Sequence, residues 1–187
     1  MTSIFSAFGL SASAGLNAYI PLLVVSLLAK FTNLIQLSEP WDALTSWWTI
    51  GVLILLGTIE FFADKIPAVD HVNDVIQTIF RPTAGAILFA ASTNAVTNIH
   101  PVLSLILGLV TAGSVHAVKS LAVRPAVTAT TSGLGDAPVS LLEDFVAVAV
   151  SILAIVIPIV IGCILIIVTS LIVMQIYSKG KKKREAA

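Results

Sequence analysis

Apolar runs long enough to cross a lipid bilayer occupy most of this chain, and they constrain its fold more than any other feature. A helix that spans about 30 Å of hydrocarbon needs roughly 20 mostly apolar residues. With 57% hydrophobic and only 11% charged residues, the chain has more apolar surface than one water-soluble core of 187 residues buries. The sequence predicts an all-α membrane protein: a single transmembrane domain over residues 1–178 and a basic tail over 179–187. Its six expected spans are 4–30, 45–66, 82–96, 101–119, 139–157 and 158–178.

The last two spans are contiguous in the sequence. As one helix, residues 139–178 would be about 60 Å long at 1.5 Å per residue, about twice the thickness of the hydrocarbon. Pro158 and Gly162 lie in the middle of this run, and both residue types interrupt helices. The chain is therefore expected to turn back near Pro158.

Basic residues are unevenly distributed between the loops, and this sets the expected orientation. Lys and Arg concentrate in short cytoplasmic loops of membrane proteins. With six spans, nine of the ten basic residues fall on the side of the two termini, and Lys30 alone falls on the other side. Both termini, including the KGKKKRE tail, are therefore expected in the cytoplasm. Trp41, Trp47 and Trp48 follow Lys30 and are typical of interfacial anchors.

The segment PAVDHVNDVIQTIFR, residues 67–81, is more than a linker between the second and third spans. Its apolar residues recur at helical spacing, with polar residues between them. The pattern predicts a short amphipathic helix that lies along the cytoplasmic interface, with the polar residues on a solvated face. The third span would then begin at Pro82. The apolar positions are Val69, Val72, Val75, Ile76, Ile79 and Phe80.

The first span contains SASAGLNAYIP, a run of small and polar residues that ends at Pro21. In transporters with inverted repeats, spans interrupted by Gly or Pro at corresponding positions mark the substrate site. Close helix packing also explains small residues in a span, but it explains Asn17 poorly. The sequence therefore predicts a broken first helix.

A short internal match extends this interpretation. SAGLNA in the first span aligns with TAGSVHA in the fourth, so that Gly15 meets Gly113 and Asn17 meets His116. Residues 1–97 and 98–178 would form two inverted three-helix repeats with broken helices. Under this hypothesis Asn17 faces His116 or Glu60 across a polar cavity near mid-membrane.

Charged side chains inside spans are costly and indicate function by default. Two interpretations remain open for those found here. They form a buried ion-pair network that fixes helix register, or they form a cation or proton site in which Glu60 titrates and His116 relays protons. The candidate residues of the substrate or ion pathway are Asn17, Glu60, Asp64, Lys65, His116, Lys119, Glu143 and Asp144.

Two cytoplasmic segments begin with Arg-Pro: RPTAGA at Arg81 and RPAVTATTSGLG at Arg124. A proline in the first turn of a helix leaves backbone N–H groups free, and an adjacent arginine favours an anion. The two arginines are therefore candidates for an anion or lipid-headgroup site, with ordinary loop chemistry as the alternative.

Several classes of activity lack their sequence signals. The chain contains no HExxH, GxSxG or GxxxxGK[ST] motif. A formal net charge of zero argues against nucleic acid as a partner. We expect no enzymatic activity and no cofactor. No spacing indicates a dedicated zinc site, so the sequence leaves a metal open.

The segments described so far resemble a known family. SAGLNAYIPLL, EFFADKIPAVD, RPTAGA, HAVK and SLLEDF are similar to the small bacterial integral membrane proteins grouped as domain-of-unknown-function family 4126. The resemblance covers nearly the whole chain except the basic tail, and it implies a location in the bacterial inner membrane but no activity. It matches these residues to the family's motif positions: Glu60, Asp64, Lys65, Asp70, Arg81, Pro82, His116, Lys119, Arg124, Glu143 and Asp144.

The function that we expect is a small transporter or channel for an ion or small polar solute, with its pathway near Asn17, Glu60 and His116. We expect a homo-oligomer surrounded by membrane lipids. The alternative is a non-transporting membrane protein that binds lipid or a partner complex through its cytoplasmic loops.

Overall fold

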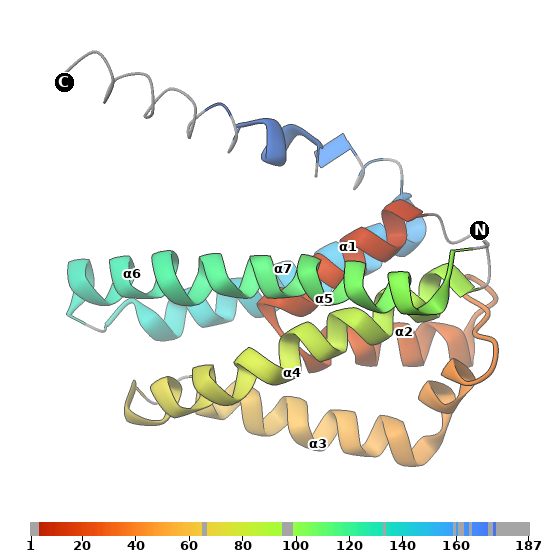
Figure 1. Cartoon of the computed structure of the whole chain (residues 1–187). Coiled ribbons are helices and arrows are strands. Elements are labelled where there is room, and N and C mark those ends of the chain that lie inside the picture. Colours follow the sequence, from red (N-terminus) through yellow and green to blue (C-terminus); the bar gives the residue numbers. More distant parts are fainter. Residues whose placement is uncertain are drawn as a thin grey trace.

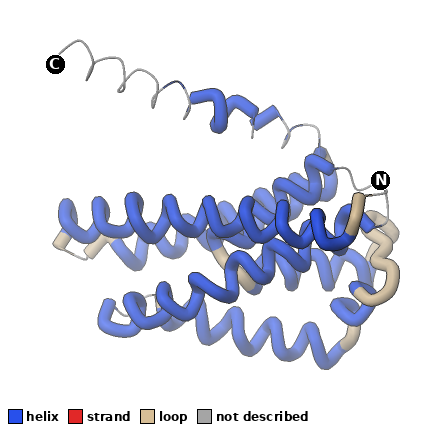
Figure 2. Tube along the Cα trace, viewed as in Figure 1, coloured by secondary structure: helices blue, strands red, loops and turns tan. Residues whose placement is uncertain are grey.

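The computed structural model describes residues 4–64, 67–94, 99–132, 134–158, 160, 163–164, 166–171 and 174, with the backbone alone at 67–72, 74 and 94. This part of the chain is all-α, with seven α-helices, and Figure 2 shows no strand in it. The elements, labelled in Figure 1, are α1 (Ile4–Leu16), α2 (Tyr19–Phe31), the 3₁₀ segment η1 (Trp41–Thr45), α3 (Trp47–Ala63), α4 (Pro67–Asn94), α5 (Pro101–Val118), the π segment η2 (Lys119–Val123), α6 (Arg124–Thr131) and α7 (Asp136–Val156).

Three helical stretches are long and apolar enough to cross a bilayer: Val75–Thr93 within α4, Pro101–Thr131 and Asp136–Val156. Three shorter apolar helices, α1, α2 and α3, accompany them. The predictions of an all-helical chain and of several apolar helices of membrane-spanning length are confirmed.

Helix α1 lies at the centre of the bundle and packs against α4, α5 and α7. Its buried positions are mostly Ala, Ser and Gly, which allow neighbouring backbones to approach closely. A Cβ atom on Gly15 would lie only 2.5 Å from the carbonyl oxygen of Ala112 on α5. The Ser11 hydroxyl donates to the carbonyl oxygen of Gly85 on α4 at 2.9 Å. The small residues of the first span therefore do pack helices together.

The predicted break in the first span is confirmed, because α1 ends at Leu16 and α2 begins at Tyr19. The side chain of Asn17 stabilises it. Its Oδ1 accepts hydrogen bonds from the backbone N–H groups of Tyr19, at 3.0 Å, and Ile20, at 2.9 Å. These groups have no acceptor within the helix, and an asparagine oxygen is well suited to cap them. Pro21 lies in the first turn of α2, where its missing N–H is tolerated.

The predicted boundary between an amphipathic helix at 67–81 and a third span beginning at Pro82 is wrong. Helix α4 runs without interruption from Pro67 to Asn94, with Pro82 inside it. Proline removes one backbone hydrogen bond from a helix interior. Here Ala84, Gly85 and Ala86, which begin two residues after Pro82, are buried, and α4 packs extensively against α5 and α1. This tertiary packing holds the helix together across the proline.

The predicted loop after the fourth span is also wrong. Helices α5 and α6 form one continuous rod in Figure 1, joined by η2. In that wider turn the N–H of Arg124 bonds to the carbonyl of Lys119, five residues earlier. The Thr128 hydroxyl donates to the carbonyl of Arg124 and supports the next turn. The rod is regular at Gly113, so the fourth span has no break there to match the one in the first.

The expected turn near Pro158 agrees with the structure, since α7 ends at Val156. In Figure 1 the described residues that follow turn back above the bundle, and Ile164, Val168 and Thr169 border cavities together with residues of α1, α5 and α7. The sixth predicted span is described only in part, and the basic tail 179–187 lies outside the described residues.

Helices α1 and α2 run in opposite directions along the bundle (Figure 1), because Phe8 near the start of α1 contacts Phe89, Tyr19 at the start of α2 contacts Phe80, and Phe31 at the end of α2 contacts Trp47. The first predicted span therefore turns back at its break and does not run from one end of the bundle to the other, which contradicts six spans with both termini on one side. The two repeats remain a prediction.

Candidate functional site

Arg81 lies at the centre of a buried polar network between the helices. It is on α4 and its side chain is fully buried. Its Nη2 atom donates to Glu60 Oε1 on α3 at 3.0 Å and lies 3.8 Å from Asp64 Oδ2, one helical turn further along α3. Both carboxylates are almost completely buried. A buried charge requires such partners, because an isolated one loses the favourable hydration that water provides.

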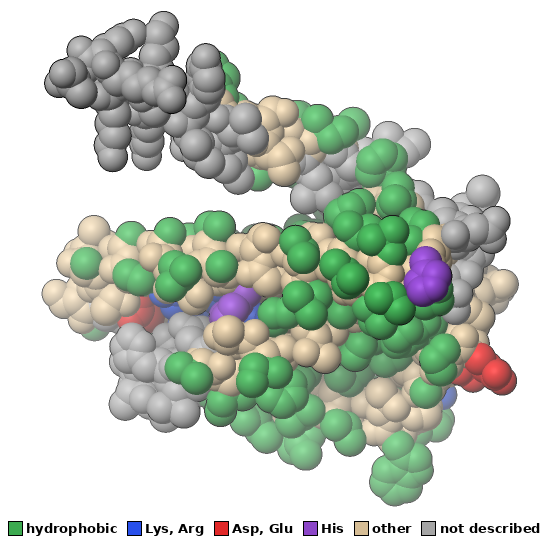
Figure 3. All heavy atoms as spheres, viewed as in Figure 1, with side chains coloured by type: hydrophobic (Ala, Val, Ile, Leu, Met, Phe, Trp, Pro, Cys, Tyr) green, Lys and Arg blue, Asp and Glu red, His purple; other side chains and the backbone are tan. Residues whose placement is uncertain are grey.

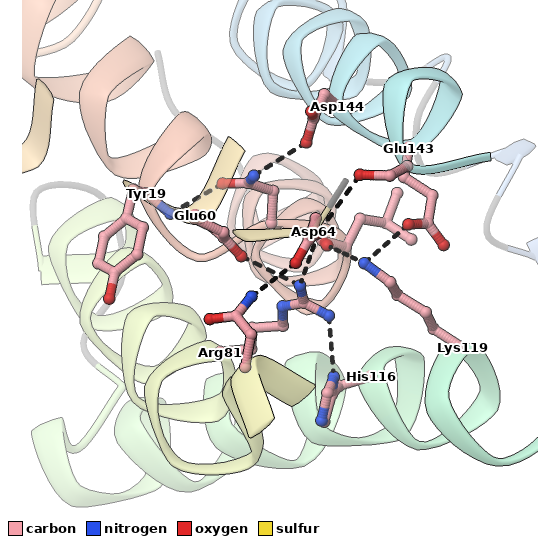
Figure 4. Close-up of polar contacts among 12 residues, drawn as sticks. Tyr19, Glu60, Asp64, Arg81, His116, Lys119, Glu143 and Asp144 are labelled. Carbon is pink, nitrogen blue, oxygen red and sulfur yellow. Dashed lines mark hydrogen bonds and ion pairs between the residues drawn. The ribbon is translucent and has the colours of Figure 1, made fainter. Parts of the chain in front are cut away.

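His116 brings α5 into the same network. Its Nδ1 atom lies 3.2 Å from Arg81 Nη1, and its Nε2 atom lies 3.1 Å from the hydroxyl of Thr78 on α4. Figure 4 shows the imidazole directed towards the guanidinium from the α5 side. The predicted candidates Glu60 and His116 are therefore connected through Arg81.

Asp64 forms a second branching point. Its Oδ2 atom accepts from Arg124 Nη2 at 3.2 Å, and its Oδ1 atom accepts from Asn73 Nδ2 at 2.6 Å. Ser140 on α7 adds a longer bond of 3.4 Å to Oδ2. This single carboxylate thus connects α3, α4, the α5–α6 rod and α7.

From Arg124 the network continues to the end of α1. Arg124 Nη2 lies 3.5 Å from Glu143 Oε2 on α7, and the same oxygen pairs with Lys119 Nζ at 2.8 Å. Lys119 Nζ also donates to the carbonyl oxygen of Leu16 at 3.0 Å. The last carbonyls of a helix carry partial negative charge and lack intrahelical partners. The ammonium group of Lys119 is therefore bound at the C-terminal end of the broken helix.

Asn17 does not face His116 or Glu60 as expected. Its Nδ2 atom donates to Asp144 Oδ1 on α7 at 3.0 Å, while its Oδ1 caps α2. Asn17 and Asp144 line a cavity of about 380 Å³ whose other walls are largely apolar side chains of α2 and α3. The expectation failed because Asp144, and not the matched position His116, lies across from the break.

The structure assembles most of the predicted pathway residues. Figure 4 shows Glu60, Asp64, Arg81, His116, Lys119, Glu143 and Asp144 gathered where α1 ends. In Figure 3, charged side chains and a histidine appear recessed between the α5–α6 rod and the first part of α4, and a second histidine and an acidic side chain lie at the opposite end of this face. Lys65 and the side chain of Asp70 lie outside the described residues.

Neither arginine lies at a free helix N-terminus, contrary to the reasoning that suggested an anion site. Arg81 is inside α4, and Arg124 continues the rod directly from η2. Both guanidinium groups bind the carboxylate of Asp64. The two Arg-Pro segments therefore share one buried acidic partner.

Sequence reasoning missed three polar partners: Asn73, Thr78 and Ser140. It assigned Asn73 and Gln77 to a solvated face, yet Asn73 binds Asp64 and Gln77 is only 2% exposed. A signal was present, because positions 73, 77 and 81 are spaced by four and lie on one face of a helix. Reading 67–94 as one helix would have placed Asn73 and Gln77 on the same helix face as Arg81.

One carboxylate of the site, that of Glu60, is only partly paired. Glu60 is 1% exposed, and its Oε2 atom has no hydrogen-bond partner among the described residues. Buried carboxylate oxygens are seldom left without a donor. Across the described part of the chain, no group of three or more His, Cys, Asp or Glu side chains is arranged to hold a metal ion.

The chain belongs to the family described as a domain of unknown function (DUF4126), whose model matches residues 4–178. No curated protein and no solved structure matches the chain. The family assignment agrees with the resemblance drawn from the sequence and gives no activity.

Proposed function

We propose that this protein is a small membrane transporter or channel for an ion or small polar solute, with its site at the break between α1 and α2. The observation that carries the proposal is the buried charged network that ends on this break. Lys119 binds the last carbonyl of α1, and Asn17, the next residue after Leu16, binds Asp144. Helix ends exposed within a membrane are tolerated where they line a binding site.

The proposal includes the finer features expected from the sequence. The chain would lie in the bacterial inner membrane with its basic C-terminal tail in the cytoplasm. It would act as a homo-oligomer among membrane lipids, without enzymatic activity. The 28-residue α4 would place its first turns at the cytoplasmic interface and its later turns in the bilayer.

The alternative is a non-transporting membrane protein that binds lipid or a partner complex through its cytoplasmic loops. The extent of ion pairing favours it: Arg81, Lys119 and Arg124 each contact a carboxylate within 4 Å. Paired charges of this kind can fix helix register without taking part in transport. If the protein transports, replacing specific polar side chains of the site should abolish flux while the protein still folds.

The test compares Asn17→Leu and Glu60→Gln with the wild type. Purified protein in liposomes would be assayed for flux of monovalent ions, protons and small polar solutes, beside thermal stability in detergent. We expect both variants to abolish flux while the oligomer remains folded, with a lower thermal midpoint for Asn17→Leu because it also removes the cap of α2. Asn33→Leu and Glu39→Gln, at exposed positions on the loop after α2, are matched controls that should transport normally. Unchanged flux in both site variants would refute the placement of the site.

A further inference from the structure

The hydrogen bonds of His116 define its protonation state. A guanidinium group has only donors, so Nδ1 of His116, 3.2 Å from Arg81 Nη1, must act as an acceptor and carry no proton. The remaining proton is then on Nε2, which donates to the hydroxyl oxygen of Thr78 at 3.1 Å. These two contacts are those of a neutral ring that carries its proton on Nε2.

We propose that the ion coupled to this site is the proton, bound at Nδ1 of His116 in competition with Arg81. The inference rests on the proposed function and names its coupling ion. When a proton from water adds to the Nδ1 lone pair, the hydrogen bond from Arg81 Nη1 is lost, and two cations face each other. Imidazole is the side chain whose unperturbed form changes charge between about pH 5 and pH 8, and Glu60 and Asp64 beside Arg81 offset the added positive charge.

The groups around His116 allow Arg81 to withdraw. Among the described residues, the charged groups that face this pair are Glu60 and Asp64 from α3, with Lys119 one turn along the same rod as His116. Arg81 Nη2 is 3.0 Å from Glu60 but 3.8 Å from Asp64, so a shift away from His116 would shorten the second contact. The two carboxylates would then hold the displaced guanidinium.

This shift would reach the broken helix. Asp64 Oδ2 is shared with Arg124, and Arg124 also contacts Glu143. A closer Arg81 would push Arg124 towards Glu143, whose same oxygen holds Lys119. Lys119 is bound to the carbonyl of Leu16, so the contacts from His116 to the end of α1 are continuous. Proton binding would in this way change the strength with which the α1 terminus is held.

The variant His116→Gln removes proton binding at this position and keeps both hydrogen bonds. A glutamine can accept from Arg81 through its carbonyl oxygen and donate to Thr78 through its amide, but it does not take up a proton in this range. His100→Gln is the matched control, since His100 is exposed at the other end of α5 and, among the described residues, its ring accepts only from the backbone N–H of Val102. Proteoliposome flux at pH 5 to 8 and ¹⁵N-histidine NMR of the wild type in nanodiscs are the two measurements.

In the wild type we expect the His116 ring to change from the Nε2–H tautomer to the doubly protonated form on acidification. Flux should change about tenfold or more over this range, as the charged fraction of an imidazole does. His116→Gln should remove this pH dependence, and His100→Gln should keep it.

The outcomes separate this inference from the proposed function. A protein that transports, but whose His116 stays in one tautomer from pH 5 to 8 or whose His116→Gln variant keeps the full pH dependence, overturns the proton assignment alone. A protein whose His116 titrates as described but that carries no flux overturns the transport function and leaves the proton site standing. The wild-type NMR titration does not depend on the variant being folded.

Discussion

Replacing Gly108 with alanine is expected to push α4 and α5 apart. A Cβ atom at this position would lie 2.3 Å from the carbonyl oxygen of Gly85, 2.6 Å from Phe89 Cβ and 2.7 Å from Ala86 Cα. All three atoms are backbone or directly attached to it, so no side-chain rotation relieves the overlap. Opening the shortest contact to the 3.4 Å of ordinary packing requires a displacement of about 1 Å.

The magnitude follows from two opposing terms. Overpacking a tight contact costs about 1–3 kcal/mol, and the upper end applies because the clashing atoms belong to backbones. Alanine in place of glycine regains about 1 kcal/mol of helix propensity. The net destabilisation is about 2 kcal/mol, which lowers the thermal midpoint of a chain of this length by about 4–8 °C.

The separation of α4 from α5 should also change the buried polar network. The hydrogen bond between Arg81 Nη1 on α4 and His116 Nδ1 on α5 joins the two helices at 3.2 Å, and an increase of about 1 Å exceeds hydrogen-bonding distance. Gly108→Ala should therefore release His116 from Arg81 as well as lower stability. ¹⁵N-histidine NMR reports the release, and thermal unfolding in detergent reports the stability.

Gly51→Ala on α3 is the matched control. A Cβ atom there meets nothing within 4 Å, so the variant should gain about 1 kcal/mol from helix propensity and keep the His116 signal unchanged. A Gly108→Ala protein as stable as Gly51→Ala, with His116 unaltered, would refute the packing geometry on which this reasoning depends.

Two further predictions concern the charges and the orientation. Arg81→Gln leaves the buried Glu60 carboxylate without its cation and should lower the free energy of unfolding by about 3–5 kcal/mol. Adding Glu60→Gln to this variant should recover at least about 1 kcal/mol. Purely additive losses in thermal unfolding would show that the pair is not coupled. In a Cys163→Ser background, cysteines placed at Asp42 and at Thr130 should react with a membrane-impermeant maleimide from opposite sides of the vesicle. Labelling from one side would exclude the proposed topology.

Much of the architecture follows from local chemistry that the sequence displays. The apolar runs require helices, since a backbone in hydrocarbon must satisfy its own hydrogen bonds. Asn17 before Tyr19 predicts a break, because its side chain caps a new helix. Helix α7 ends two residues before Pro158. The membership of the buried network was also predictable, since each charged residue in an apolar helix must find a partner.

Tertiary packing decided how these parts combine. Pro82 does not end α4, because contacts with α5 and α1 outweigh one missing backbone bond, and Pro125 continues the rod after the wider turn η2. Asn17 binds Asp144, 127 residues away, and no local pattern encodes which of several buried acids lies opposite the break.

The partners of each charge were likewise set by the structure. Asp64 receives Arg81 and Arg124 because the close approach of small residues sets the positions of α4 and α5 against α1. Chain composition determines that charges pair in an apolar interior, but the distances between helices determine which charges pair. Those distances result from the Gly15, Gly85 and Gly108 contacts, and they place the end of α1 within reach of Lys119.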